Sequence, residues 1–337
     1  MKMARRSRAL KILLLIVVLV AIWYGWRWIR AGVQMPGKSY AGNLDPLDAY
    51  QTRLRDNLKS HVEMLAGQIG ERNLQHLDAL NRAADYIRQT MQQREYNVQE
   101  DTYQVEGKTA RILYATLEGK NRTGPFVIGA HYDSVSGSPG ANDNASGVAA
   151  VLELARMLKD ESPERSIIFA FFPNEEPPYF QTKDMGSLVF ARGFQKQNLN
   201  VSGMISIETI GYYSDQKGSQ KYPAPLASFY PDTGNFIGFV GDVKSRGMLK
   251  KALAEFRLKT HFPSEGASLP RWIEGVGFSD HWSFWQVGAP AIMVTDTAMF
   301  RYPDYHKSSD TLDKLDYDRM ARVVLGLKRV VLKLTSE

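Results

Sequence analysis

The sequence predicts an α/β fold with a largely parallel central sheet, preceded by an N-terminal transmembrane helix. Over residues 46–337, short apolar runs of strand type alternate with amphipathic helical patterns, as in parallel-sheet proteins. The 337 residues are 44% hydrophobic and 23% charged, which is typical of a globular protein with a sizeable core. The chain has no cysteine, so disulfides, thiolate nucleophiles and cysteine-bound metals are excluded.

The first 30 residues are predicted to form a cytoplasmic basic stub and a membrane anchor. Five basic residues precede the uncharged run Ile12–Trp26. Spanning a bilayer takes ~20 residues, and Lys11 and Arg27 can extend their charged ends to its two surfaces. We therefore expect residues 10–29 to lie in the lipid bilayer as a single-pass anchor, with the N-terminus cytoplasmic and the remaining chain extracytoplasmic. Aromatic residues that suit the membrane interface are Trp23, Tyr24, Trp26 and Trp28.

A cleaved signal peptide, followed by secretion, is the alternative for this segment. The small-residue site at Ser39–Ala41 lies too far beyond the apolar run for ordinary processing, which favours the uncleaved anchor. Residues 31–45 carry glycine, proline and serine without periodicity and are predicted to be a linker.

The net charge of +6 belongs to the N-terminus. Residues 1–30 hold seven of the 42 basic residues and no acid, which leaves 35 basic against 36 acidic residues, a net charge of −1, beyond them. A body with that balance is not expected to bind nucleic acid.

The elements of the body follow from hydrophobic periodicity along the chain. We expect two long loops, 212–235 and 261–278, which either line a site or are plain surface insertions. Asp280 and His281 fall near the second loop, where a surface histidine is the default. The expected helices are 46–67, 75–94, 145–159, 184–195, 244–257 and 317–334, and the expected strands are 98–105, 111–117, 126–130, 166–172, 203–210, 236–240 and 289–295.

Polar residues follow several of these strands, and ligand sites in parallel sheets gather at such strand ends. Asp133 stands two residues after His131, so its carboxylate can hold the ring while the imidazole binds a metal. Asp143 precedes a strong helix, where capping is the common role, although one carboxylate there could also bridge two cations.

Three further polar sites complete the set. Glu175 and Glu176 follow a buried strand, and because successive side chains diverge, one can bind a metal while the other acts as a general base. Glu208 ends a strand and needs a partner, since burying a lone carboxylate is costly. His306 precedes the last helix. These hard and borderline donors suit zinc, with manganese or cobalt possible.

The ordered motifs resemble the co-catalytic zinc aminopeptidase family, whose relatives include glutamate carboxypeptidases and glutaminyl cyclases. The resemblance covers roughly residue 50 to the C-terminus and implies a mixed-sheet, three-layer α/β/α sandwich. It also implies a zinc peptidase domain over residues 46–337, which hydrolyses peptides that have a free N-terminus. The motifs are His131–Ser134, Gly140–Gly147, Asn174–Glu176, Tyr305–His306 and Ser309–Asp313.

The resemblance also implies a role for each site residue. A first zinc would take His131, Asp143 and Glu208, and a second would take Asp143, Glu176 and His306, so that two zinc ions per chain share Asp143. Asp133 would orient His131, Glu175 would accept the proton of the attacking water, and Tyr305 would donate to the oxyanion.

Glu208 departs from the aspartate that is usual at its position, which puts the metal preference in question. A single-zinc glutaminyl cyclase and a non-catalytic binding domain of the same fold remain alternatives. The presence of both His131 and Asp133 favours the two-metal hydrolase, and Glu175 argues against a purely binding role.

Overall fold

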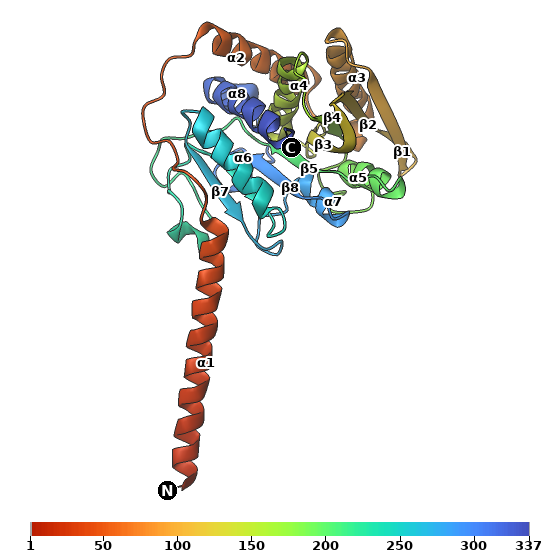
Figure 1. The fold of residues 1–337 in the computed structure, drawn as a ribbon. Coiled ribbons are helices and arrows are strands. Elements are labelled where there is room, and N and C mark those ends of the chain that lie inside the picture. Colours follow the sequence, from red (N-terminus) through yellow and green to blue (C-terminus); the bar gives the residue numbers. More distant parts are fainter. Residues whose placement is uncertain (1, 337) are drawn as a thin grey trace.

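The computed structural model describes residues 2–336, in which a long N-terminal helix projects from the rest of the chain (Figure 1). The body is built on one eight-stranded sheet in the order β1-β2-β4-β3-β5-β8-β6-β7. The strands are β1 Val98–Val105, β2 Lys108–Leu117, β3 Asn121–His131, β4 Arg165–Phe172, β5 Gly203–Glu208, β6 Ile237–Gly241, β7 Ser264–Ser268 and β8 Ala291–Thr295.

The sheet is mixed, with a parallel centre. Strands β4, β3, β5 and β8 run parallel to one another, so their carboxyl ends share one edge. Strands β1 and β2 form an antiparallel hairpin that continues antiparallel to β4. At the other end, β6 runs antiparallel to β8 and carries β7 parallel to itself, so β6 and β7 end at the opposite edge. The predicted mixed, largely parallel α/β/α sandwich is confirmed.

Helices cover both faces of the sheet (Figure 1). Apolar residues of α2, α3, α4, α6 and α8 pack in the larger core, and those of α5 and α7 pack in the smaller one on the other side. Ile29 and Val33 of α1 join this smaller core. The helices are α1 Lys2–Val33, α2 Ala49–Val62, α3 Leu77–Gln93, α4 Gly147–Leu158, α5 Gly186–Lys196, α6 Arg246–Lys259, α7 His281–Gln286 and α8 Tyr317–Leu334.

Helix α1 is long and apolar enough over Leu13–Val33 to cross a membrane, a test that a signal sequence near the N-terminus also passes. It runs on through the first residues of the predicted linker. Its last turns touch the body: the rings of Trp26 and Phe229 have centroids 4.8 Å apart. Gly32 lies so close to β7 that a Cβ there would come within 2.5 Å of the Ser268 carbonyl oxygen.

Two elements were missed in the sequence. The predicted loop 261–278 contains edge strand β7, whose sequence Ser-Glu-Gly-Ala-Ser has no apolar alternation to reveal it. The short helix α7 buries His281, which has no solvent exposure, so the expectation of a surface histidine was wrong.

Candidate metal centre

The five predicted ligands come together at the edge where the parallel strands end. His131 and Glu208 are the last residues of β3 and β5. Asp143 sits in the irregular turn Ala141–Ser146 before α4, and Glu176 follows β4. The structure groups them as His131, Asp143 and Glu208, and as Asp143, Glu176 and His306, with the ligand atoms of each group within 4.8 Å of one another.

Asp143 lies between the two groups and offers one oxygen to each. Its Oδ1 is 3.3 Å from His131 Nε2, and its Oδ2 is 3.0 Å from His306 Nε2. His131 Nε2 also lies 3.1 Å from Glu208 Oε2, and His306 Nε2 lies 3.2 Å from Glu176 Oε2. One carboxylate placed between two sets of donors is the arrangement that a pair of bridged metal ions needs.

The electrostatics of these residues fit divalent cations. Burial and the neighbouring Asp143 raise the pKa of Glu176 to about 7, and burial raises the pKa of Glu208 to about 7 as well. Although burial opposes ionisation, His131 and His306 hold the pKa of Asp143 below its usual value. Asp143 Oδ1 and His306 Nε2 are buried without a hydrogen-bond partner in the part of the chain that the structure describes. Bound cations would relieve the crowding of negative charge and would also provide partners for these two unpaired ligand atoms.

Glu175 is the carboxylate left over from the two groups. The residue is 7% exposed, and its Oε2 lies 4.0 Å from His131 Nε2. Glu175 therefore lies beside the centre without belonging to either ligand group. Burial, and after it the charge of Glu208, raises its pKa well above the usual value. A carboxyl group with a raised pKa beside a metal centre suits proton transfer.

Asp133 connects two of these strand ends. Its Oδ1 is 3.4 Å from His131 Nδ1. Its two oxygens also accept the backbone N–H groups of Glu175 and Glu176, each at 3.2 Å. Asp133 therefore tethers the loop after β4 and lies beside the histidine that ends β3.

Several residues that hold the Asp143 turn had no predicted role. Asp310 accepts the backbone N–H groups of Asn142 and Asp143 at 2.8 and 3.1 Å, and the Tyr302 hydroxyl donates to it at 2.9 Å. Asn144 Oδ1 accepts the Thr209 backbone N–H at 3.1 Å, which ties the turn to the end of β5. The motif Ser309–Asp313 was used only to support the family resemblance, so the tethering role of Asp310 was missed.

Arg72 holds the backbone around the metal centre, and no role was predicted for it. Its guanidinium is fully buried and donates to the carbonyl oxygens of Tyr132 at 2.7 Å, Gly140 at 2.8 Å and Pro139. Burial lowers its pKa to about 10, so it stays charged at neutral pH. These bonds clamp the loop that runs from His131 to Asp143. A single arginine between α2 and α3 carries no motif that would have revealed this.

Residues 279–281 are buried where the chain enters α7, and the first of them contacts the centre. Ser279 Oγ donates to Glu208 Oε2 at 2.8 Å, which supplies a partner to this buried carboxylate. Asp280 has no solvent exposure, and neither of its oxygens has a hydrogen-bond partner among the described residues. His281 Nε2 lies 2.8 Å from the Val276 carbonyl, and its ring packs edge-on against Trp285.

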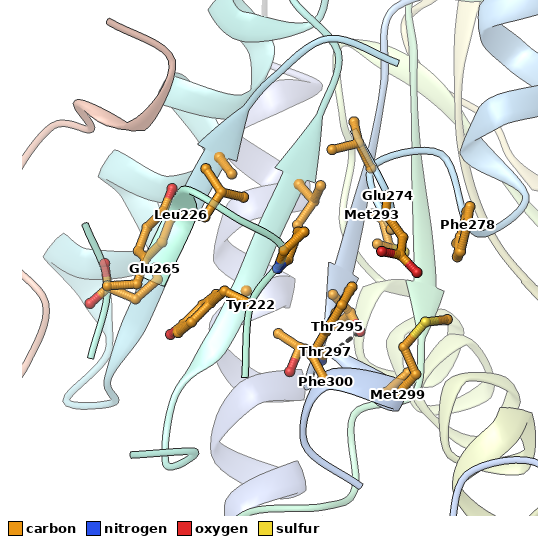
Figure 2. Close-up of a pocket in the computed structure, with 18 of the residues that line it drawn as sticks. Tyr222, Leu226, Glu265, Glu274, Phe278, Met293, Thr295, Thr297, Met299 and Phe300 are labelled. Carbon is orange, nitrogen blue, oxygen red and sulfur yellow. Dashed lines mark hydrogen bonds between the residues drawn. The ribbon is translucent and has the colours of Figure 1, made fainter. Parts of the chain in front are cut away.

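An apolar cavity adjoins the centre (Figure 2). Glu208 and Tyr305 stand at its metal side, and the ring of Tyr305 stacks on His306 at 3.8 Å. Residues of β6, β7 and β8 line it together with residues of both predicted loops, which favours the site-lining alternative for these loops. Side chains that line it include Tyr222, Leu226, Tyr230, Phe278, Met293 and Phe300.

The family model of peptidase family M28 matches residues 113–331, and the chain belongs to this family. The predicted family and the prediction of a peptidase are thereby confirmed. The uncharacterized protein YfbL of Escherichia coli (strain K12) is 37% identical over 282 residues, covering 81% of this chain and 86% of that protein.

More distant relatives carry functional names. Leucine aminopeptidase 1 of Sclerotinia sclerotiorum is 29% identical over 64% of this chain, and the match spans 54% of that longer protein. Two solved structures share the fold. The zinc aminopeptidase BSAP of Bacillus subtilis has a TM-score of 0.67 at 14% identity, with 82% and 94% of the two chains covered. The glutaminyl cyclase of Fimbriiglobus ruber has a TM-score of 0.62 at 18% identity, with 88% and 97% covered.

Proposed function

We propose that this chain is a zinc-dependent aminopeptidase that removes N-terminal residues from peptides, anchored in a membrane by α1. The observation that carries the proposal is the pair of donor groups that share Asp143, with Glu175 beside them and an apolar cavity adjoining. In this proposal two zinc ions are held, one by His131, Asp143 and Glu208 and the other by Asp143, Glu176 and His306.

Bound zinc would supply Lewis acidity that polarises the scissile carbonyl and lowers the pKa of the attacking water. Glu175 accepts the proton of that water and later delivers it to the leaving amine. Asp133 orients His131 and holds the loop that carries Glu175 next to it. Tyr305, beside His306 at the cavity entrance, donates to the oxyanion that forms on the carbonyl.

The charges of the cavity favour a substrate amino terminus. Glu208, Glu265 and Glu274 are among the described residues that line it, and none of those residues is basic (Figure 2). A protonated α-amine gains from such surroundings, whereas a substrate carboxylate would be repelled. This favours an aminopeptidase over a carboxypeptidase. The apolar walls suit an apolar or aromatic N-terminal side chain.

The test combines metal analysis with turnover on the full chain in detergent. We expect about two zinc ions per chain and chelator-sensitive release of N-terminal residues from a panel of aminoacyl substrates. Glu175→Gln should keep the metal and lose about 100- to 10,000-fold in kcat, the range attributed to a general base. Glu95→Gln, an exposed glutamate far from the centre, is the matched control and should change neither quantity.

Two outcomes would contradict the proposal. Unchanged turnover of Glu175→Gln would remove the general base from the mechanism. One metal per chain, together with cyclisation of N-terminal glutamine in place of hydrolysis, would instead indicate a glutaminyl cyclase.

A further inference from the structure

Helix α1 is docked on the body along one face of its last two turns. Trp26 contacts Phe229, Ile29 and Val33 pack in the smaller core, and Gly32 lies against Ser268. These positions recur at helical spacing, so they share one side of the helix. Figure 1 shows the free part of α1 leaving the body beside the end of β7.

This docking sets the height of the body relative to a bilayer. The apolar stretch Leu13–Val33 has 21 residues, about 31 Å of helix, which matches a hydrocarbon core of about 30 Å. Trp26 lies about 5 to 10 Å below the outer end of the span, whether the span ends at residue 29 or at Val33. Phe229 contacts Trp26 and therefore lies at the depth of the bilayer's outer interface.

The chain around Phe229 is suited to that depth. Residues 222–231 contain no charged side chain. Ala224, Pro225, Ala227 and Ser228 are exposed, small and uncharged. A loop in bulk water gains nothing from such a composition, whereas a loop among lipid headgroups avoids the cost of desolvating charges.

The loops that follow β6 and β7 lie at the same depth as Phe229. Ser268, which meets Gly32, ends β7, and the Leu269 backbone N–H donates to the Gly241 carbonyl at the end of β6. The loops after these strands expose Val243, Lys244, Arg271 and Trp272, and Trp272 is 79% exposed. Of the carboxylates in these loops, Asp242 is buried and paired with Arg271 at 2.7 Å, Asp280 is buried, and Glu274 is exposed and lines the cavity. An exposed tryptophan on loops that also expose Lys244 matches a bilayer interface with anionic headgroups.

We infer that the catalytic body rests on the bilayer through an interfacial surface made of residues 223–229, 243–244 and 271–272. This inference rests on the membrane anchor in the proposed function. Since β6 and β7 run antiparallel to β8, the loops after them lie at the sheet edge opposite to the metal centre, and Phe229 joins them through its contact with Trp26. The catalytic edge is therefore turned toward the aqueous phase.

The absence of cysteine permits a direct test with single-cysteine variants carrying an environment-sensitive fluorophore. Full-length Trp272→Cys is labelled and reconstituted in phosphatidylcholine–phosphatidylglycerol vesicles that contain a spin-labelled quencher lipid. Gln99→Cys is the matched control, because Gln99 is exposed on β1. Strand β1 is the outermost strand on the side of the sheet away from β7. We expect quenching of the probe at 272 and none at 99. Neutralising Lys244 with Gln should lower the docked-to-undocked ratio about fivefold, the effect of one cation at an anionic surface.

The outcomes separate the two proposals. Chains that float with vesicles but show no quenching at 272 would overturn the interfacial surface and leave the anchor in place. Chains that do not float would overturn the anchor and the surface together, whereas peptide hydrolysis on the same sample tests the enzyme independently. A probe at 272 that responds to added peptide substrate, and not to quencher lipid, would assign Trp272 to the rim of the cavity and overturn the inference.

Discussion

Replacing Arg72 with methionine tests whether the metal loop depends on a buried clamp. Methionine has a similar length and no donors, so the substitution leaves the carbonyls of Tyr132, Pro139 and Gly140 without the guanidinium. An unsatisfied buried polar group costs about 1–3 kcal/mol, so three of them predict a loss of roughly 3–9 kcal/mol. That loss is a large part of the 5–15 kcal/mol by which a typical protein is stable.

Thermal unfolding of the full chain in detergent measures this loss. For a domain longer than about 250 residues, 1 kcal/mol corresponds to roughly 1.5–2 °C in Tm, so Arg72→Met should lower Tm by at least about 5 °C. Arg82→Met, on the exposed side of α3, is the matched control and should stay within about 1 °C. A Tm of Arg72→Met within about 2 °C of the parent would refute the reasoning, because water or a shifted loop would then be satisfying those carbonyls.

Two further predictions concern the centre and its support. Asp143→Asn removes the shared ligand from both donor groups, so metal analysis should show loss of both ions and activity should fall by at least about 100-fold; one tightly retained ion would show that the groups act independently. Burial lowers the pKa of His281 to about 4, below the ~6.5 of an unfolded chain, so the unfolded state binds more protons. The contribution of neutral His281 to the free energy of unfolding is complete above pH ~6.5 and is lost as the pH falls toward 4, by up to about 3 kcal/mol. His281→Gln should therefore flatten the pH dependence of Tm over that interval. An unchanged slope of Tm against pH would contradict the lowered pKa of His281.

The sequence predicted the elements whose signal is local. Buried strands such as Ser166–Phe172 are continuous apolar runs, and α8 has a clean helical period, so both were found close to their observed bounds. Strand β7 escaped because it is an edge strand of small and polar residues whose place is decided by pairing with β6. Such pairing leaves no pattern within the segment itself.

For the candidate site, too, some residues could be predicted from the sequence and others could not. The five candidate ligands were chosen from the sequence because motifs at strand ends resemble those of a known family in the same order. The groups that hold those ligands, Arg72 and Asp310 above all, act through backbone carbonyl and amide groups of distant segments. A contact with a backbone group places no demand on the residue type at the other end. Sequence reasoning about one chain therefore cannot see it.

The antiparallel turn of the sheet at β6 has a consequence for which substrates can be reached. Glu208 lies level with Thr295 of β8, which pairs with Gly238, and Gly241 at the end of β6 lies three residues further toward the proposed lipid surface. Measured along the strands, the centre thus stands at least about 10 Å above that surface. A peptide still tethered in the same bilayer would need about three or more extended residues to bridge this height. We therefore expect the protein to select its substrates by length. Membrane-anchored peptides with a short N-terminal segment outside the bilayer should not be cleaved, whereas longer N-terminal segments and free peptides should be.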